Sequence, residues 1–547
     1  MLRLNALETA ASNHWAAELR RKNGNSKKSF QKVNNTVRFA VKTVTDMPLQ
    51  LRRGKTLFGE RNDMNLSLKL ALSLALLTSI STSAMAAATE EEATRLTKVL
   101  QTYLTDKEGV VSVEANGDDY DLVIDIAPLT AGITDGTTVK LTPLEFTLTD
   151  KGGGKWEVNE DQPITLNLDI KDTLSVEEKV ESVIFSGVFD EAMGAFASAD
   201  AEYKNFVVSE KVTNPDGTKS DIGVTLKSMT VSQLANAAAN GGADIIAKIA
   251  MDGLSENIAM AADPTKAMPA MNIVLTAENG NADLTIKGTK IKSIFDLTAF
   301  FIAHQSKEAI QKDAAALKAI LTGGLPLWES VEETGKLNKV TAATAFGQFA
   351  MDSVDFGLGA TGAVKDGKLS ERIGVNGLVV PAAIVPPWAT QLVPKNFNFD
   401  FTVSNFDLAT PANMILSTLD LSKDNPLPDG FEQLLMPAFM PTGSVKVTLN
   451  PTSVNNDTYT FSAEGSMVAG PSAMPTGQAT VKAKGLDELL KIVTQAPPEA
   501  GLQQGAAVII AAKGLGKAEA DGSLSWKIES APGGKFLVNG IDPSTIH

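Results

Sequence analysis

Cysteine is absent from the 547 residues of this chain, and histidine occurs only three times. Without cysteine the protein has no disulfide bonds, so its stability must come from buried apolar surface and backbone hydrogen bonds. His14 lies near the start and His547 is the last residue, which leaves His304 as the one histidine of the central part. This scarcity excludes Ser-His-Asp triads, Cys-His dyads and zinc sites of cysteine or histidine, unless His304 is itself a base.

Other catalytic signals are also missing. His304 follows the apolar residues 300–303 in a helical pattern, which favours a packing role. The chain has no G-x-S-x-G elbow and no Walker loop, and residues 87–547 contain no S-x-x-K. A glycoside hydrolase, however, needs only two carboxylates. Because residues 87–547 contain 59 acidic residues, that class of enzyme stays open.

Two short motifs have a functional interpretation that their context opposes. Residues 357–362 match G-x-G-x-x-G, but the following residues 363–368 predict a turn in place of the helix that a dinucleotide site requires. Four aspartates lie close together: Asp118, Asp119, Asp121 and Asp125. Their oxygen atoms suit calcium, yet the spacing departs from a calcium loop and the intervening residues predict a strand. We therefore expect no cofactor and no metal.

An export signal is predicted between Met64 and Ala86. Lys69 supplies positive charge, Leu70–Ile80 is apolar, and an A-x-A cleavage pattern ends at Ala86. The apolar run is too short for a transmembrane helix, which needs roughly 20 residues. We expect cleavage between Ala86 and Ala87, or one or two residues later, and a periplasmic protein that does not span the membrane.

The residues before this signal are unusual for an exported protein. Residues 1–63 carry 13 Lys/Arg against 5 Asp/Glu and have no apolar run, so we predict a disordered basic extension. Translation from Met64, with a gene model that begins too early, would explain it; a nucleic-acid-binding arm is the rival interpretation. The chain's net charge is −15, and since residues 1–63 contribute +8 and Lys69 +1, residues 87–547 carry −24. Such acidity repels phosphate, so we expect no nucleic-acid partner.

Alternating apolar and polar residues predict strands through most of the mature chain. Residues 163–170 alternate cleanly, and the alternation continues from about residue 182 to residue 278. Turn signals such as Asn116-Gly117 and residues 214–217 separate the runs. These connections are too short for parallel crossovers, which need a dozen or more residues, so the sheet should be mainly antiparallel.

Helical segments interrupt the strands. Thr89 is placed to cap the first helix, and the longest helical stretch runs from about Ile291 to Leu321. We expect five regions along the chain: the basic extension 1–63, the signal peptide 64–86, an N-terminal β-rich half 87–290, a helical segment 291–345 and a C-terminal β-rich half 346–547.

Three apolar stretches are candidates for contact with a ligand or a membrane: Leu378–Val393, Phe295–Ile302 and Phe431–Met440. Each could line a lipid-sized cavity. Core packing is the simpler interpretation, because helices that cover a sheet bury such faces.

Several sequence features carry a resemblance to a known family. The signal peptide, the opening helix, residues 485–490 (GLDELL), and the ending with residues 521–526 (DGSLSW) and 534–540 (GKFLVNG) resemble uncharacterised alphaproteobacterial periplasmic proteins that share a domain of unknown function. The layout of strands followed by short helices is more distantly similar to AsmA-like envelope proteins, whose curved sheets are associated with lipid handling. The resemblance implies an envelope protein and identifies no catalytic residue.

These observations together predict an α+β fold: a mainly antiparallel, long, curved β-sheet with short helices packed on one face. The leading hypothesis is a non-enzymatic periplasmic cell-envelope protein that binds a lipid or another apolar ligand. The alternatives are a carboxylate-dependent hydrolase acting on cell-wall glycan, and a structural protein-interaction module. The sequence leaves the oligomeric state open.

Overall fold

The computed structural model describes residues 87–545, apart from residues 133–135, 214–216, 263–268, 305, 424–425, 472 and 532–533. The basic extension expected at 1–63 and the signal peptide expected at 64–86, with Ala86 at its cleavage site, lie outside the described residues. Ala87 is the first described residue and is exposed. All the described residues belong to one compact unit.

Strands make up most of this unit. They are β1 (Val111–Asn116), β2 (Asp119–Ile124), β3 (Thr137–Leu141), β4 (Leu144–Gly152), β5 (Lys155–Ile170), β6 (Leu174–Asp190), β7 (Ala195–Thr213), β8 (Lys219–Ala237), β9 (Ala243–Met260), β10 (Met271–Thr289), β11 (Ser330–Thr344), β12 (Gly347–Thr361), β13 (Gly367–Asn376), β14 (Asn396–Phe406), β15 (Val445–Asn455), β16 (Thr460–Gly470), β17 (Ala473–Lys484), β18 (Lys517–Ala518), β19 (Leu524–Ala531) and β20 (Lys535–Val538).

The helices are shorter and fewer. The α-helices are α4 (Glu90–Tyr103), α5 (Ala127–Thr130), α6 (Ile291–Ala303), α7 (Lys307–Lys312), α8 (Ala314–Gly324), α9 (Ala409–Thr418), α10 (Glu432–Phe439), α11 (Leu486–Gln495) and α12 (Gln503–Leu515). The 3-10 helices are η3 (Pro387–Leu392), η4 (Pro498–Ala500) and η5 (Pro543–Thr545). Thr89 caps α4 as the sequence predicts, because its hydroxyl accepts a hydrogen bond from the Glu92 amide at 3.2 Å.

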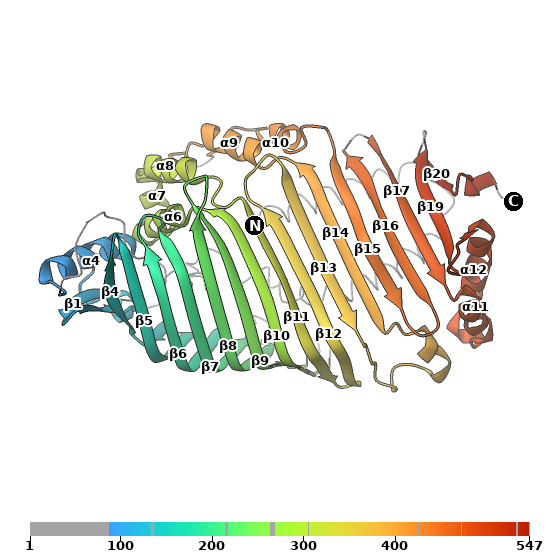
Figure 1. Ribbon diagram of the computed structural model, residues 1–547, viewed down its shortest axis with the longest axis horizontal. Coiled ribbons are helices and arrows are strands. Elements are labelled where there is room, and N and C mark those ends of the chain that lie inside the picture. The colour runs from blue at the N-terminus through green and yellow to red at the C-terminus, as the bar shows by residue number, and fades with distance from the viewer. Residues whose placement is uncertain are drawn as a thin grey trace. The chain divides into compact units, whose positions relative to one another are not determined.

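The strands form one antiparallel meander. From β4 to β17 each strand pairs with the next strand along the chain. At one end β4 pairs with β2, and β2 with β1; at the other end β17 pairs with β19, which also pairs with β18 and β20. Figure 1 shows the result, an open curled sheet whose first and last strands lie far apart. The predicted antiparallel, curved sheet is confirmed.

The helical segment expected at 291–345 is shorter in the structure. Helices α6 to α8 end at Gly324, and Ser330–Thr344 forms strand β11, which pairs with β10 on one side and β12 on the other. The two β-rich halves are therefore parts of a single sheet. The helices leave this sheet after β10 and the chain re-enters it at the next position.

The helices gather in three groups and do not form the continuous layer over one face that the sequence led us to expect. Helix α4 lies near β1 and β4, α6 to α10 follow one edge of the sheet, and α11 and α12 lie beside β19 (Figure 1). Leu96 and Leu100 of α4 are buried against Trp156 and Val158 of β5. The other two clusters join Phe295 of α6 to β8 and β9, and Leu486 of α11 to β17 and β19.

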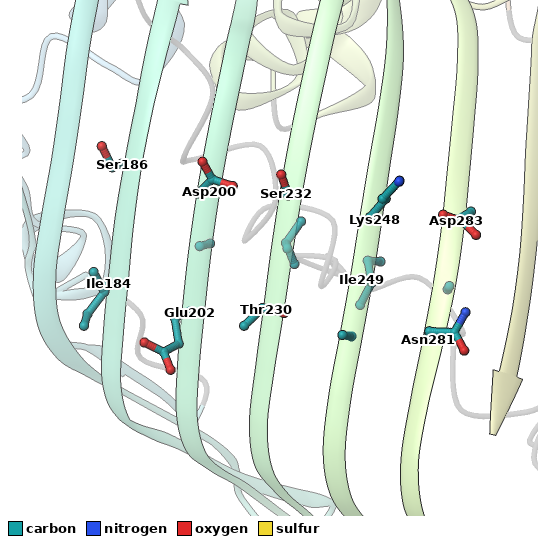
Figure 2. A pocket seen from close by; sticks show the side chains of 14 residues that line it. Ile184, Ser186, Asp200, Glu202, Thr230, Ser232, Lys248, Ile249, Asn281 and Asp283 are labelled. Atoms are coloured by element: carbon teal, nitrogen blue, oxygen red, sulfur yellow. The ribbon is translucent and has the colours of Figure 1, made fainter. Parts of the chain in front are cut away.

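A line of aligned bulges crosses seven consecutive strands. On each strand from β6 to β12, a residue at the same level is left out of the ladder, and the residue directly after β13 continues the line. These residues are Glu181, Asn205, Lys227, Gly253, Glu278, Lys339, Asp352 and Gly377. Every second residue of this bulge line has a left-handed backbone, with φ of 50° at Asn205, 65° at Gly253, 51° at Lys339 and 65° at Gly377. Extra residues of this kind bend strands. Figure 2 shows the strands curving away beyond Ile184 and Glu202, toward this line.

Polar contacts join neighbouring residues of the bulge line. The Asn205 amide donates to Glu181 Oε2 at 2.7 Å, and Lys339 Nζ donates to Asp352 Oδ1 at 2.8 Å. This ion pair raises the pKa of Lys339 and lowers that of Asp352. Because both partners are exposed, the pair contributes little to stability. The backbone conformation is the stronger constraint.

Replacing Gly253 by alanine tests that constraint. A Cβ atom at Gly253 would lie 2.9 Å from the Cβ atom of Lys227, and the φ of 65° disfavours a side chain. We expect Gly253→Ala to lower the free energy of unfolding by about 1–2 kcal/mol, measured by urea denaturation. Gly223→Ala on the neighbouring strand is the control, because a Cβ atom there meets nothing within 4 Å. Equal effects of the two substitutions would contradict this account.

Candidate functional site

The antiparallel register sorts the side chains of the sheet into two faces. Directly paired residues lie on the same side of a sheet, so pairings followed from strand to strand trace rows across it. One row contains Glu160, Phe185, Ala201, Val231, Ile249, Ala282, Gly335, Phe356, Ile373 and Phe399. The next row on that side contains Gln162, Val183, Tyr203, Met229, Met251, Gly280, Leu337, Val354, Val375, Phe397, Val454, Phe461, Ala483 and Leu524. We call this side the apolar face.

The opposite side, which we call the polar face, has a different composition. A row between the two above contains Asp161, Ile184, Glu202, Thr230, Ala250, Asn281, Lys336, Asp355, Gly374, Asn398, Ser453, Ser462 and Lys482. The residues of the bulge line shift the two-residue alternation by one position on every strand from β6 to β12. Val180 and Val183, on the two sides of this line, are therefore both on the apolar face, and both are buried.

Large apolar side chains remain exposed in the middle of the apolar face. Ile373 is 36% exposed and its cross-strand partner Phe399 is 44% exposed. Leu358, Leu369 and Met467, on the same face, are 53%, 41% and 40% exposed. Strands β12 to β16 thus present apolar side chains that neither the sheet nor the described helices bury. Two charged side chains, Glu333 and Glu371, are the direct partners of Leu358 and lie on the same face. Exposed apolar side chains gathered on one surface are typical of a binding site.

Both ends of the apolar face are covered. At the β5 end, Trp156 and Val158 are buried in the α4 cluster. At the β19 end, Ala483 and Trp526 are buried together with Leu486 of α11. The open part of the face lies between these clusters, and its backbone groups are paired within the ladder. It therefore offers an apolar ligand dispersion contacts and burial from water, with few hydrogen-bonding groups.

Glycines and alanines determine the surface shape of the open part of the apolar face. Gly335 lies between Ala282 and Phe356, and a Cβ atom at Gly335 would stand 2.2 Å from the Phe356 ring. The phenylalanine ring therefore lies over the glycine. At Gly280 a Cβ atom would stand 2.7 Å from Leu337. Large side chains of one strand thus fill the space that the glycines of the neighbouring strand leave free. These side chains therefore protrude less from the sheet.

Three polar side chains interrupt the apolar face at its β5 end. Glu160 and Gln162 begin the two rows, and Tyr203 lies two strands away in the row of Gln162. The Gln162 amide donates to Glu160 Oε1 at 2.9 Å. The Tyr203 hydroxyl forms no hydrogen bond with another described residue. We call Glu160, Gln162 and Tyr203 the polar trio.

The apolar surroundings perturb the acid–base properties of the trio. Burial raises the pKa of Glu160 from 4.5 to about 7, and the hydrogen bond from Gln162 opposes this rise. Burial also raises the pKa of Tyr203, and the Glu160 carboxylate raises it further. Glu160 is directly paired with Phe185 of β6, which in turn is paired with Ala201 of β7, so neither of these neighbours is a cation that could compensate its charge.

The polar face carries a shallow depression of about 580 Å³ over β6 to β10. Figure 2 shows the polar side chains that line it, among them Asp200, Glu202, Lys248 and Asp283. Asp200 and Glu202 lie side by side on β7, and Asp283 lies three strands away, which is roughly 14 Å at the usual strand spacing. A glycoside hydrolase places its two carboxyl groups on opposite sides of the scissile bond. These acidic groups all project from one surface, an arrangement that does not suit that chemistry.

His304 has a packing role. It follows α6, and its ring stacks on Phe300 with the ring centroids 4.0 Å apart. Its Nε2 lies 2.8 Å from Asp313 Oδ2 and its Nδ1 lies 2.7 Å from the Phe300 carbonyl oxygen. The hydrogen bond with Asp313 raises the pKa of His304. These contacts join α6 to the start of α8.

The structure places the two short motifs in strands and turns. Residues 357–361 lie within strand β12, paired on both sides, and no helix begins there. Of the four aspartates, Asp121 accepts a hydrogen bond from the Asn116 side chain and Asp125 accepts one from the Ala127 amide, both at 2.8 Å. Within the described residues, no group of three or more His, Cys, Asp or Glu is arranged to hold a metal ion.

The three apolar stretches divide between core and surface. Phe295 and Phe300 of α6 are buried, as are Phe431 and Met440 at the ends of α10. The stretch from Leu378 to Val393 connects β13 to β14 at one edge of the sheet and includes η3. None of the three lines the open part of the apolar face, so the sequence pointed to apolar segments away from the candidate site.

The polar trio is not among the residues that the sequence motifs single out, although the sequence carries a signal for it. Ile164, Leu166 and Leu168 occupy alternate positions of β5, and the same phase leads back through Gln162 and Glu160 to Val158. Two polar residues therefore stand where the alternation calls for apolar ones. Tyr203 carries no such signal, because its position beside them depends on the register of β6 and β7.

The raised pKa of Glu160 predicts a pH-dependent stability. Since the folded protein holds the Glu160 proton more tightly than the unfolded chain does, this group lowers the free energy of unfolding progressively as the pH rises from about 4.5 to about 7. Partial exposure reduces the effect, which we place at about 1–2 kcal/mol. Urea unfolding should show Glu160→Gln to be more stable than the wild type by this amount at pH 8, with the difference largely gone at pH 4.5.

Glu202→Gln, on the polar face, controls for the loss of one negative charge. A Glu160→Gln difference that is the same at pH 4.5 and pH 8, or that follows the Glu202→Gln profile, would contradict a buried carboxyl group.

Comparison with family models, with curated proteins and with solved structures gives no match for this chain. No helix among the described residues is both long enough and apolar enough to cross a membrane. The geometry of the apolar face is therefore the basis for a functional proposal.

Proposed function

We propose that this chain is a non-enzymatic protein of the cell envelope that holds the acyl chain of a lipid, or a similar apolar chain, along the open part of its apolar face. The observation that carries the proposal is the pair of apolar rows between the α4 cluster and the α11 cluster, with Ile373 and Phe399 exposed at their centre and Glu333 and Glu371 in the neighbouring row. A soluble protein that keeps such a surface gains from a ligand that removes it from water.

An extended apolar chain fits this surface better than a folded partner does. One row runs across ten strands and the other across fourteen. The longer row covers roughly 48 Å between β6 and β16 at the usual spacing, and the face curls along the bulge line. A folded protein partner usually adds hydrogen bonds around an apolar centre. The open rows from Val231 to Phe399 contain no charged side chain that could supply them.

The acidic side chains of the depression over β6 to β10 project from one surface, which disfavours a glycan hydrolase. A protein-interaction module would bind another folded chain, and the experiment below distinguishes such a partner from a lipid.

Two pairs of substitutions test the proposal, because each face carries one exposed apolar pair. Ile373 and Phe399 are direct cross-strand partners on the apolar face, and Leu234 and Ile246 are direct partners on the polar face, where they are 61% and 53% exposed. We expect Ile373→Glu/Phe399→Glu to weaken binding of a fluorescent fatty-acid analogue at least tenfold, since two carboxylates would enter an apolar site. Leu234→Glu/Ile246→Glu should bind as the wild type does.

The measurement is a fluorescence titration of the full chain, accompanied by native mass spectrometry of the protein isolated from bacterial cells. The exposed positions predict little change in the unfolding midpoint of either variant. Equal binding by the two double variants would contradict the proposal, as would a wild-type protein that carries and takes up no lipid. Co-purification of a folded protein in place of lipid would favour the interaction module.

A periplasmic location is part of the proposal and rests on the predicted signal peptide. When the full chain is expressed in a Gram-negative bacterium, the protein in the periplasmic extract should begin at Ala87 by amino-terminal sequencing, or one or two residues later. Replacing Ala86 by arginine should leave an uncleaved precursor in the membrane fraction. A product that begins at Met1 in the cytoplasm would contradict this location.

A further inference from the structure

We infer that the polar trio binds the polar end of the ligand, and that this end is a hydrogen-bond donor such as a hydroxyl or an ammonium group. The inference rests on the proposed function, because it assumes that an apolar chain lies along the apolar face. It adds a direction and a chemical class: the ligand is a single-chain amphiphile with its polar end at β5 and its tail toward β14.

The position of the trio sets the direction. Glu160 and Gln162 begin the two rows of the apolar face, and beyond them the next residues of β5 in the same phase, Val158 and Trp156, are buried under α4. The trio therefore stands where the covered core ends and the open face begins. At the other end one row stops at Phe399 and the other reaches Phe461 and Ala483, and no polar side chain recurs along either row. Glu333 and Glu371 lie in the neighbouring row of this face.

The hydrogen bonds within the trio set the class of the polar group. Gln162 donates to Glu160 Oε1, which leaves Oε2 of the carboxylate available as an acceptor. The Tyr203 hydroxyl forms no hydrogen bond with the described residues, and it can donate or accept. A ligand group that donates to Glu160 and accepts from, or donates to, Tyr203 satisfies both. An alcohol does so, and an ammonium group also compensates the carboxylate charge.

A carboxylate ligand fits this place poorly. Two carboxyl groups close together in apolar surroundings repel each other unless one holds a proton. The neighbours of Glu160 on β6 and β7, Phe185 and Ala201, supply no cation that would relieve the repulsion. A trimethylated ammonium matches the charge but has no N–H to donate. The trio should therefore give different affinities for amphiphiles that have the same chain and differ only at the polar end.

The test uses four competitors with the same twelve-carbon chain: dodecylamine, dodecanol, dodecanoate and dodecyltrimethylammonium. Each competitor is titrated at pH 8 against the full-length protein with the neutral apolar probe N-phenyl-1-naphthylamine bound. Each is kept below its own critical micelle concentration. We expect dodecylamine and dodecanol to displace the probe at concentrations roughly tenfold lower than the other two do, because only they donate a hydrogen bond to Glu160.

Three variants connect the preference to the trio. In Glu160→Leu the four competitors should become equivalent within about twofold while the probe still binds. Glu160→Gln should keep the preference for the alcohol and lose the preference for the amine, since an amide accepts hydrogen bonds without charge. Tyr203→Phe should weaken the alcohol and the amine and leave dodecyltrimethylammonium unchanged. Glu202→Leu, one residue from Tyr203 on the polar face, is the control and should behave as the wild type does.

The outcomes separate the two proposals. A wild-type protein that does not bind the probe overturns the proposed function, and the inference with it. A wild-type protein that binds the probe but shows equal competition by all four amphiphiles overturns the inference alone. A preference that survives in both Glu160→Leu and Tyr203→Phe also overturns it, because the selecting group would then lie elsewhere.

Discussion

The structure depends on one constraint: side chains that are paired across neighbouring strands must point to the same face of the sheet. In an antiparallel ladder, a shift of one residue moves every side chain of a strand to the other face. Here the pairing runs without a break from β4 to β17, so one strand out of phase would place its apolar residues among the polar residues of its neighbours. The bulge line satisfies this constraint because neighbouring strands all have their bulge at the same level. From Glu181 on β6 to Asp352 on β12, every strand has its extra residue at the same level, so the alternation shifts on all of these strands together.

This arrangement also separates the parts of the sheet that stabilise the fold from the part that stays open. The largest fully buried side chains, such as Phe189, Leu96 and Leu148, belong to the α4 cluster at one end, and a smaller cluster around Trp526 closes the other end. Between them the strands are held by ladder hydrogen bonds and by close contacts such as that of Phe356 with Gly335. The middle therefore keeps its apolar side chains without a helix to cover them. A layer of helices over the middle of the sheet would bury these apolar side chains in a core, and the open part of the apolar face would no longer be accessible to a ligand.

Much of the fold is predictable from the sequence, because local alternation carries it. The clean alternation of residues 163–170 gives strand β5, and short turns such as that at Gly117 require antiparallel neighbours. The expected helical segment 291–345 is wrong over Ser330–Thr344. Glu333 and Gly335 there occupy the positions in phase with Val331 and Leu337, and the bulge at Lys339 breaks the two-residue period. The apolar alternation on which a strand prediction relies is therefore weak in this segment. The bulge line itself follows from the register between strands, which no single segment specifies.

The sequence predicts the chemical class of the ligand but not the residues that bind it. The scarcity of histidine and cysteine and the apolar stretches favour an apolar ligand, but stretches such as Phe431–Met440 lie at one edge of the sheet. The residues of the open face come one or two from each strand and are ordinary in their own segments.

The charge of the chain makes the place of Glu160 informative. Residues 87–547 carry a formal charge of −24, yet most of that charge is on surfaces where water and salt screen it within about 8–10 Å. General acidity therefore selects weakly among ligands that are already in contact with the sheet. Glu160 differs because it lies on the apolar face beside Phe185, where its pKa is raised and its charge is poorly screened. If the apolar face holds a chain-like ligand, the selection between polar ends is made at this residue, while the long rows beyond it determine how strongly the chain is held.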